Sequence, residues 1–359
     1  MVRRTLGLAL ASIALGCGGG GGGNNPDGGG NNVGPDGAVN GAHLFTHDMP
    51  WDRDVSGVTK ASESDAIIAA LDGAGGWGTG DFRTDISIEI LHADASTPKV
   101  TLAPKDDAWS QAMFQDTDHT EFYVPDCDNV PFPVPPSGAL EGETAYACTN
   151  DGDCHLLVID DAAHTLYEMW RGDKQGNTFY AGCVAVWDLH KAYDQDLLRG
   201  KGCSSADAGG FPITAMLATA DEVKAGEVKH ALRFILPNAR IRAGIYVPPG
   251  THSTFPTSGG PNMPPYGVRL RLKASFDESK LETEGARVLA RALKKYGMFL
   301  ADGGSVPLTI ANDRFTTAKW SEVGVNEQSL SMLAPTDFEV VEFGTPVDYF
   351  ANTDCIRQP

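Results

Sequence analysis

The sequence lacks an apolar segment long enough to cross a membrane. The apolar run near its start covers only residues 6–15, whereas a membrane-spanning helix needs about 20 residues. Arg3 and Arg4 precede this run, and the small residue Gly16 follows it. A positive start, a short apolar run and a small residue together make a secretory signal. We therefore expect the chain to be exported.

Basic residues are also scarce. The chain carries 28 lysines and arginines against 47 aspartates and glutamates, and its formal net charge is −19, which becomes −21 once the two arginines of the signal are removed. So acidic a protein is a poor partner for nucleic acid or for anionic lipid surfaces. We expect no nucleic-acid ligand, and membrane contact only through a lipid anchor.

Familiar catalytic motifs are missing as well. The sequence contains no G-x-S-x-G, no H-E-x-x-H and no P-loop. A glycine-rich stretch at residues 73–81 follows a predicted helix, which makes it a weak candidate for a phosphate-binding loop. No C-x-x-C pair occurs, which argues against a zinc site. The motifs therefore assign no reaction, and we expect no cofactor.

A single cysteine after the apolar run indicates where the protein is held. Ala14-Leu15-Gly16-Cys17 resembles the lipobox of bacterial lipoproteins, although Leu15 lies two residues before the cysteine rather than three. We predict a lipoprotein signal at residues 1–17, lipidation of Cys17, and a place at the bacterial outer membrane or cell surface. An ordinary secreted protein is the alternative. Residues 18–41 are mostly glycine and asparagine and predict a disordered tether.

Six further cysteines remain behind the secretory signal, an even number that is typical of disulfides. Cys148 and Cys154 flank the turn sequence TNDGD, and we expect them to pair. We pair Cys183 with Cys203, and Cys127 with Cys355, among the 15 connectivities that six cysteines allow.

Most periodic segments alternate as strands do. In residues 85–91 the isoleucines face one way and the polar residues the other, and residues 155–160 form an apolar run typical of a buried strand. Two helices are predicted: one over residues 63–73 capped by Ser62, and one over residues 283–297 that ends at Gly297. The pattern predicts a mainly-β fold, like a β-sandwich or jelly roll with about two packed helices, in a single domain over residues 42–359.

Polar residues on apolar strand faces are the first candidates for chemistry. Glu168, Asp188 and His230 each share a strand face with apolar residues. Burial there would raise the pKa of a carboxyl and suit a general acid. The alternative is that these residues lie at strand ends or bond to backbone. Asp207, in a glycine-rich loop, is the candidate base or nucleophile, and we predict that it meets His230 beside a pocket.

Other residues are candidates for binding a ligand. Arg233 and His252 would bind polar groups, and Trp170 and Trp187 would stack on sugar rings unless they pack in the core. Arg269, Arg271 and Lys273 form a stripe that is either a solvated face or a polyanion site. An acidic cluster would hold structural calcium or form a solvated loop. It consists of Asp116, Asp118, Glu121, Asp126 and Asp128.

Several segments resemble a group of secreted bacterial proteins found in myxobacteria and actinobacteria. These segments lie at residues 154–170, 185–189, 204–213, 229–244, 264–276 and 290–304. The resemblance covers residues 45–343, implies one domain and supplies no catalytic residues.

The candidate residues favour a carbohydrate-active enzyme on extracellular glycan. In a glycoside hydrolase Glu168 or Asp188 would be the acid. In a polysaccharide lyase His230 or Tyr180 would take the proton and Arg233 would neutralise a uronate. The alternative is a surface protein without catalysis, for glycan binding, adhesion or envelope structure. Two polar groups in one cleft would indicate a carbohydrate-active enzyme. A shallow aromatic platform would indicate a protein that only binds glycan. No pattern predicts an oligomeric state.

Overall fold

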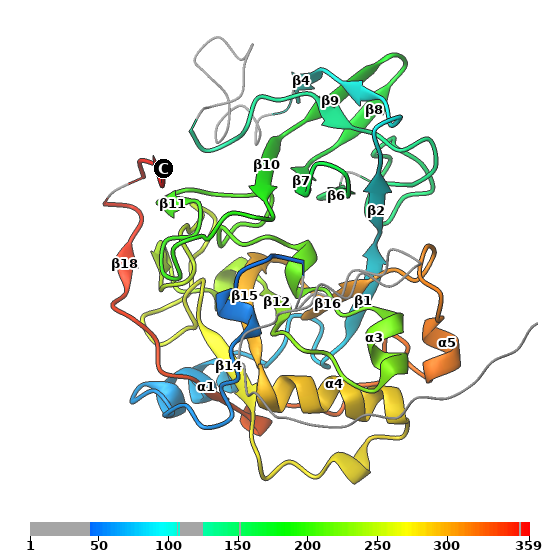
Figure 1. The fold of residues 1–359 in the computed structure, drawn as a ribbon. Helices are drawn as coiled ribbons and strands as arrows, with labels where there is room; N and C mark the ends of the chain where they lie inside the picture. Colours follow the sequence, from blue (N-terminus) through cyan, green and yellow to red (C-terminus); the bar gives the residue numbers. More distant parts are fainter. Residues whose placement is uncertain (1–43, 106, 108–124, 151, 352) are drawn as a thin grey trace, which may run out of the picture.

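The computed structural model describes residues 44–105, 107, 125–150, 152–351 and 353–359 (Figure 1). Its largest sheet has six strands in the order β1-β16-β12-β15-β14-β17. β1 pairs with β16 and β12 with β15 in parallel, and the other neighbours are antiparallel. The strands are β1 (Thr84–Ile88), β16 (Leu308–Ala311), β12 (Leu232–Leu236), β15 (Met298–Gly303), β14 (Arg269–Leu272) and β17 (Phe338–Val340).

A second sheet of four strands has the order β10-β7-β6-β2 and lies above the first in Figure 1. Its strands are β10 (Cys183–Asp188), β7 (Thr165–Trp170), β6 (Leu156–Asp160) and β2 (Ile90–Ala93). A three-stranded sheet beside it contains β4 (Leu102–Pro104), β9 (Thr178–Ala181) and β8 (Asp173–Gln175). Three short pairs are β3–β5 (Lys99–Val100, Phe132–Pro133), β11–β19 (Gly200–Lys201, Ile356–Arg357) and β13–β18 (Ile245–Tyr246, Val347–Asp348).

The α-helices lie around the six-stranded sheet (Figure 1). They are α1 (Ser64–Gly73), α3 (Ala220–Ala225), α4 (Glu284–Lys295) and α5 (Trp320–Val323). Short 3₁₀ turns are η2 (Pro50–Asp52), η3 (Thr214–Met216), η4 (Asn238–Arg240), η5 (Glu278–Lys280) and η6 (Pro335–Asp337). None of the helices in the described part of the chain has the length and apolar character to span a bilayer.

The two predicted helices form, but one cap was wrong. Thr283 accepts a hydrogen bond from the amide of Ala286 and starts α4, and Gly297 follows its end with a positive φ of 69°. Ser62 does not cap α1, because its hydroxyl donates to Glu63 and the helix begins at Ser64.

The prediction of a mainly-β fold with a few packed helices is confirmed. The sheets contain both parallel and antiparallel pairs, whereas a jelly roll is built from antiparallel strands. The alternating stretch 85–91 is divided between two sheets, since β1 ends at Ile88 and β2 begins at Ile90. Glu89 lies between them, buried, and accepts hydrogen bonds from the amide of Ala139 and from Arg314.

The two large sheets share part of their apolar core. Ile159 of β6, Leu166 of β7 and Trp187 of β10 belong to the same buried cluster as Phe299 and Ala301 of β15. Burial of such side chains is the main source of stability. The sheets are therefore held to one another by a common core.

Three disulfides form, as predicted, but two of the three pairings were wrong. Cys148 pairs with Cys154, as expected from the short turn. The other bonds are Cys127–Cys183 and Cys203–Cys355. The reason is strand pairing between distant segments: the amide of Asp128 donates to Val184, and Lys201 in β11 lies opposite Ile356 in β19.

The two arginines of the predicted stripe are neither solvated nor open to a polyanion, whereas Lys273 is half-buried and donates to the carbonyl of Thr336. Arg269 donates to the carbonyls of Pro50, Arg53 and Tyr296, and Arg271 donates to the carbonyls of Val55 and Val58 and to Glu339. Both arginines are buried. Residues 50–58 cover this strand, and the guanidinium groups satisfy carbonyls that the cover would otherwise leave unpaired.

Candidate active site

A cleft opens where the end of β7 faces the end of β15. Its volume is about 230 Å³, just below the usual range for small-molecule sites. The lining residues are Asp153, Trp170, Arg171, Ser204, Ser205, Ala206, Ala208, Asn238, Thr254, Pro256, Tyr266, Asp302 and Gly303. Elements of both large sheets therefore contribute to it.

One wall of the cleft comes from the four-stranded sheet and the loop before β6. The indole Nε1 of Trp170 donates to Asp153 at 3.0 Å, and the backbone amide of Arg171 donates to the Asp153 carbonyl at 2.7 Å. The Arg171 guanidinium lies 5.7 Å from the Trp170 ring centre. This wall thus presents an exposed carboxylate beside an indole.

The opposite wall contains Asp302, at the end of β15. The register between β12 and β15 shifts after Phe234, so that Asp302 lies opposite Ile235. Such bulges redirect side chains and are frequent at functional sites. One carboxylate oxygen of Asp302 accepts a hydrogen bond from Arg233 at 2.9 Å, and the other accepts from the amide of Gly303 at 2.7 Å.

Arg233 joins two carboxylates beneath the cleft. It donates twice to Asp207, at 3.0 and 3.1 Å, and also to Asp302 and to Thr309. Burial and the charge of Asp207 hold the pKa of Asp302 well above its usual range, although Arg233 opposes this. One guanidinium faces two carboxyl groups here, the fully buried Asp207 and the partly buried Asp302.

A second buried ion pair extends this group. Burial alone would lower the pKa of His155, but the carboxylate of Glu141, 2.6 Å from its Nδ1, raises that pKa to about 10. The charged ring also donates through Nε2 to the carbonyl of Ala206 at 3.0 Å. We call these residues the cleft network: Glu141, His155, Asp207, Arg233 and Asp302.

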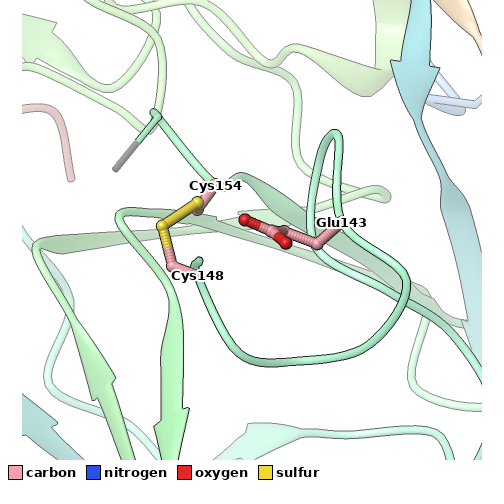
Figure 2. Close-up of side chains that lie close together, drawn as sticks. All are labelled: Glu143, Cys148 and Cys154. Carbon is pink, nitrogen blue, oxygen red and sulfur yellow. A yellow bond between two sulfur atoms is a disulfide. The ribbon is translucent and has the colours of Figure 1, made fainter. Parts of the chain in front are cut away.

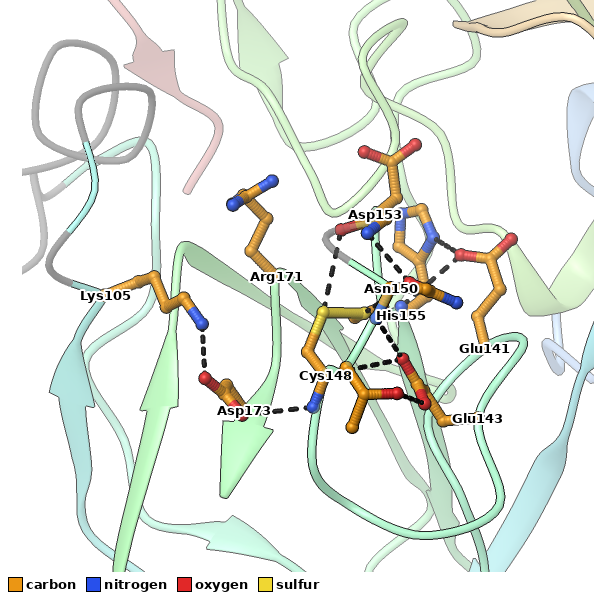
Figure 3. The surroundings of a disulfide bond; sticks show 12 residues. Lys105, Glu141, Glu143, Cys148, Asn150, Asp153, His155, Arg171 and Asp173 are labelled. Carbon is orange, nitrogen blue, oxygen red and sulfur yellow. Dashed lines mark hydrogen bonds and ion pairs between the residues drawn. A yellow bond between two sulfur atoms is a disulfide. The ribbon is translucent and has the colours of Figure 1, made fainter. Parts of the chain in front are cut away.

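A disulfide holds the loop that carries Asp153 (Figure 3). Cys154, which follows Asp153, is bonded to Cys148. The amide of Cys148 donates to Asp173, which also forms an ion pair with Lys105. The position of the wall carboxylate is therefore fixed from several sides.

The same disulfide rules out a metal there. Glu143 lies close to Cys148 and Cys154, as Figure 2 shows. The sulfurs are bonded to each other and are not the thiolates that bind metals. The carboxylate of Glu143 is also engaged, since it accepts hydrogen bonds from Thr149 and from the amide of Asn150.

Part of the predicted calcium-binding cluster binds protein groups instead. Asp128 forms ion pairs with Arg199 and Arg357, and Asp126 accepts a hydrogen bond from the amide of Ser204. These two carboxylates are held by protein groups rather than presented to an ion. The other three predicted ligands, Asp116, Asp118 and Glu121, lie outside the described residues.

Glu168 is desolvated, as its strand pattern predicted. Burial raises its pKa to about 7, against hydrogen bonds from the amide and hydroxyl of Thr214 and the amide of Ile213. Its oxygens thus bind the start of η3, and the side chain does not line the cleft. Its position is that of a structural cap.

Two other predicted residues lie away from the cleft. Asp188 is exposed at the end of β10, where its carboxylate accepts from the amide of His190, so it is not the desolvated acid that we predicted. Trp187 is fully buried against Phe45 and Tyr193 and presents no face to a sugar. Trp170 alone of the two tryptophans lines the cleft.

The predicted pairing of His230 with Asp207 does not form. His230 is fully buried; its Nδ1 bonds to the carbonyl of Ala231, and its Nε2 lies 3.3 Å from Glu222 without the alignment of a hydrogen bond. Asp52 is close enough to affect its pKa. We call Asp52, Glu222 and His230 the His230 cluster; none of the three lines the cleft.

Arg233 and His252 support the cleft from below rather than facing a ligand. Arg233 is occupied by its two carboxylates. His252 is buried and bonds to the carbonyl of Ala208 and to the hydroxyl of Tyr349, both at 2.8 Å. Burial lowers the pKa of His252, so the ring is neutral.

Sequence reasoning missed the two carboxylates of the cleft, Asp153 and Asp302. A signal existed for Asp302, because it ends an apolar strand and precedes two glycines, where sites often lie. Asp153 stood next to a cysteine and was taken as part of a turn.

We compared the chain with protein-family models, curated proteins and solved structures, and none of them matches. The resemblance over residues 45–343 therefore stays a prediction.

Proposed function

We propose that the protein is a glycan hydrolase whose reaction takes place in the cleft between Asp153 and Asp302. The observation that carries the proposal is Asp302, a carboxyl that lines an open cleft opposite Asp153 and whose pKa is raised by burial and by the charge of Asp207. Two carboxyl groups held in different environments are the usual equipment for acid–base hydrolysis of a glycosidic bond.

In this mechanism Asp302 protonates the oxygen of the leaving sugar as the glycosidic bond breaks. The carboxylate of Asp153, on the opposite wall, takes a proton from the attacking water. Trp170 offers an indole edge or face to the sugar and holds Asp153 through its Nε1. Arg233 holds Asp302 at the cleft and is itself held by Asp207.

The alternatives fit the cleft less well. A lyase would use His230 or Tyr180 as base, and neither lines the cleft. The arginine meant to neutralise a uronate, Arg233, is already paired with two carboxylates. A protein that only binds glycan would not need an acid such as Asp302 in its cleft.

Reducing-sugar release tests the proposal. The mature chain is incubated with xylan, laminarin, pectate and alginate, and the variants Asp302→Asn and Asp72→Asn run beside it. Asp72 is an exposed acid in α1 and serves as the matched control. We expect the wild type and Asp72→Asn to cleave at least one polymer and Asp302→Asn to be slower by about 10²–10⁴. No cleavage by the wild type, with retained binding to a glycan array, would establish the non-catalytic alternative.

We also propose that the protein works outside the cytoplasm and is anchored through a lipid on Cys17. Three disulfides support an oxidising location. Cys17→Ser should move the protein from the membrane fraction to the medium. Identical fractionation of the two forms would contradict the anchor.

A further inference from the structure

Two exposed phenylalanines stack on each other near the rim of the cleft. Phe255 is 60% exposed and Phe350 is 46% exposed, although both are large and apolar. Their ring centres are 5.5 Å apart and their planes differ by only 4°. We call this pair the phenyl platform. Apolar surface left in water at one place on a protein often marks a binding site.

The backbone is shaped to hold this platform. β13 and β18 pair just before it, and the amide of Tyr349 donates to the carbonyl of Gly244 at 2.8 Å. Gly244 has a φ of +63°, and a side chain there would meet the ring of Phe350 at 2.5 Å. The ring of Phe350 therefore lies flat on a glycine, and Phe255 lies on that ring.

The platform is continuous with the cleft. Thr254 and Pro256, the chain neighbours of Phe255, both line the cleft. His252 links the two places directly, because one ring nitrogen bonds to Ala208 in the cleft lining and the other to the hydroxyl of Tyr349 beside the platform. The platform therefore adjoins the part of the cleft that Thr254 and Pro256 line.

We propose that the phenyl platform is a further sugar-binding subsite, on which a polysaccharide longer than the cleft stacks one pyranose ring. The inference rests on the proposed glycan hydrolase. A flat ring with one open face suits the apolar C–H face of a pyranose. The platform offers no charged group of its own, so it selects the ring face of the sugar and chain length rather than charge.

A second copy of the chain is a poorer occupant. Two phenylalanines bury at most about 500 Å² even when fully covered, whereas a stable interface takes about 800 Å² from each partner. A single stacked sugar needs no more area than one ring provides.

The test compares Phe255→Ala with Phe315→Ala, a control that removes a phenyl ring of similar exposure, 48%, outside the cleft lining. Both run in native gels containing xylan, laminarin, pectate or alginate, and both are assayed on the trisaccharide of any polymer that the wild type cleaves. We expect Phe255→Ala to lose about tenfold in apparent affinity for a retarding polymer, which is equivalent to about 1.4 kcal/mol. Cleavage of the trisaccharide should match the wild type, and Phe315→Ala should match it in both assays.

The outcomes separate this inference from the proposed function. If polymer in the gel slows Phe255→Ala as much as the wild type, the phenyl platform is not a sugar-binding subsite, and the proposed hydrolase is unaffected. Loss of retention without cleavage by any form supports the platform and overturns the hydrolase. No retention of the wild type on any of the four polymers overturns the platform. A change in oligomeric state of Phe255→Ala by light scattering, with unchanged retention, would assign the rings to self-association instead.

Discussion

The cleft network and the His230 cluster are both largely buried groups of charged side chains, but they differ in bonding and in access. In the cleft network the carboxylates share Arg233 and His155 as partners, and Asp302 reaches the cleft. In the His230 cluster one polar atom of each member lies buried without a hydrogen-bond partner, and none lines the cleft. Burial raises the pKa of a carboxyl in both groups. Burial and a shifted pKa therefore do not identify a site; an opening to solvent does.

Breaking the cleft network should have the largest effect on stability. Arg233→Met leaves Asp207 fully buried, and Asp302 partly buried, with no cation between them. Loss of one partner from a buried ion pair lowers the free energy of unfolding by about 3–5 kcal/mol. Urea unfolding followed by circular dichroism will measure this loss. Arg83→Met is the control, because its pair with Glu327 is exposed and worth about 0–1 kcal/mol. Equal losses in the two variants would show that the network is not held as described.

Loosening the cleft wall without touching either charged group should have an intermediate effect. The Cys148–Cys154 bond closes a loop with a sequence separation of 6, and chain entropy predicts a loss of about 2 kcal/mol in Cys148→Ser/Cys154→Ser. Because Cys154 follows Asp153, glycan cleavage should also fall, whereas the pH dependence of stability that arises from Asp52 should not change. Full activity in this variant would mean that the disulfide does not position Asp153.

The His230 cluster should make the free energy of unfolding depend on pH. Burial raises the pKa of Asp52 from 3.8 to about 7, so the folded state binds its proton more tightly than the unfolded state does. Stability is then lost as the pH rises from about 4 to about 7. Asp52→Asn should remove this loss, which has a slope of at most about 1.4 kcal/mol per pH unit. Urea unfolding at pH 4, 5.5 and 7 gives the comparison, and parallel curves for the two proteins would contradict it.

Local features of the fold could be predicted from the sequence. Gly297 follows the end of α4, as the sequence predicted, and β6 (Leu156–Asp160) is the buried strand that the apolar run at residues 155–160 indicated. Cys148 and Cys154 paired because only a tight turn separates them. The desolvation of Glu168 also followed from its strand face.

What the sequence could not supply was contact between distant segments. His230 was predicted to lie beside a pocket, but the carbonyl of Trp51 accepts a hydrogen bond from the amide of Ala231, and the segment around Trp51 covers this position. The pKa of Asp302 is raised by burial and by Asp207 and is lowered by Arg233, and both of these residues lie far away in the chain. A strand pattern predicts which face of a strand is apolar, but it does not predict which segment covers that face.

Cleavage of one glycan by Asp302→Asn and His230→Gln, measured side by side, tests the central claim most directly. Both residues are charged or polar, both belong to buried groups, and only Asp302 lines the cleft. We predict that Asp302→Asn slows cleavage by about 10²–10⁴, while His230→Gln stays close to the wild type once its folded fraction is matched. Loss of activity in His230→Gln with activity kept in Asp302→Asn would contradict the account and move the active site to the His230 cluster.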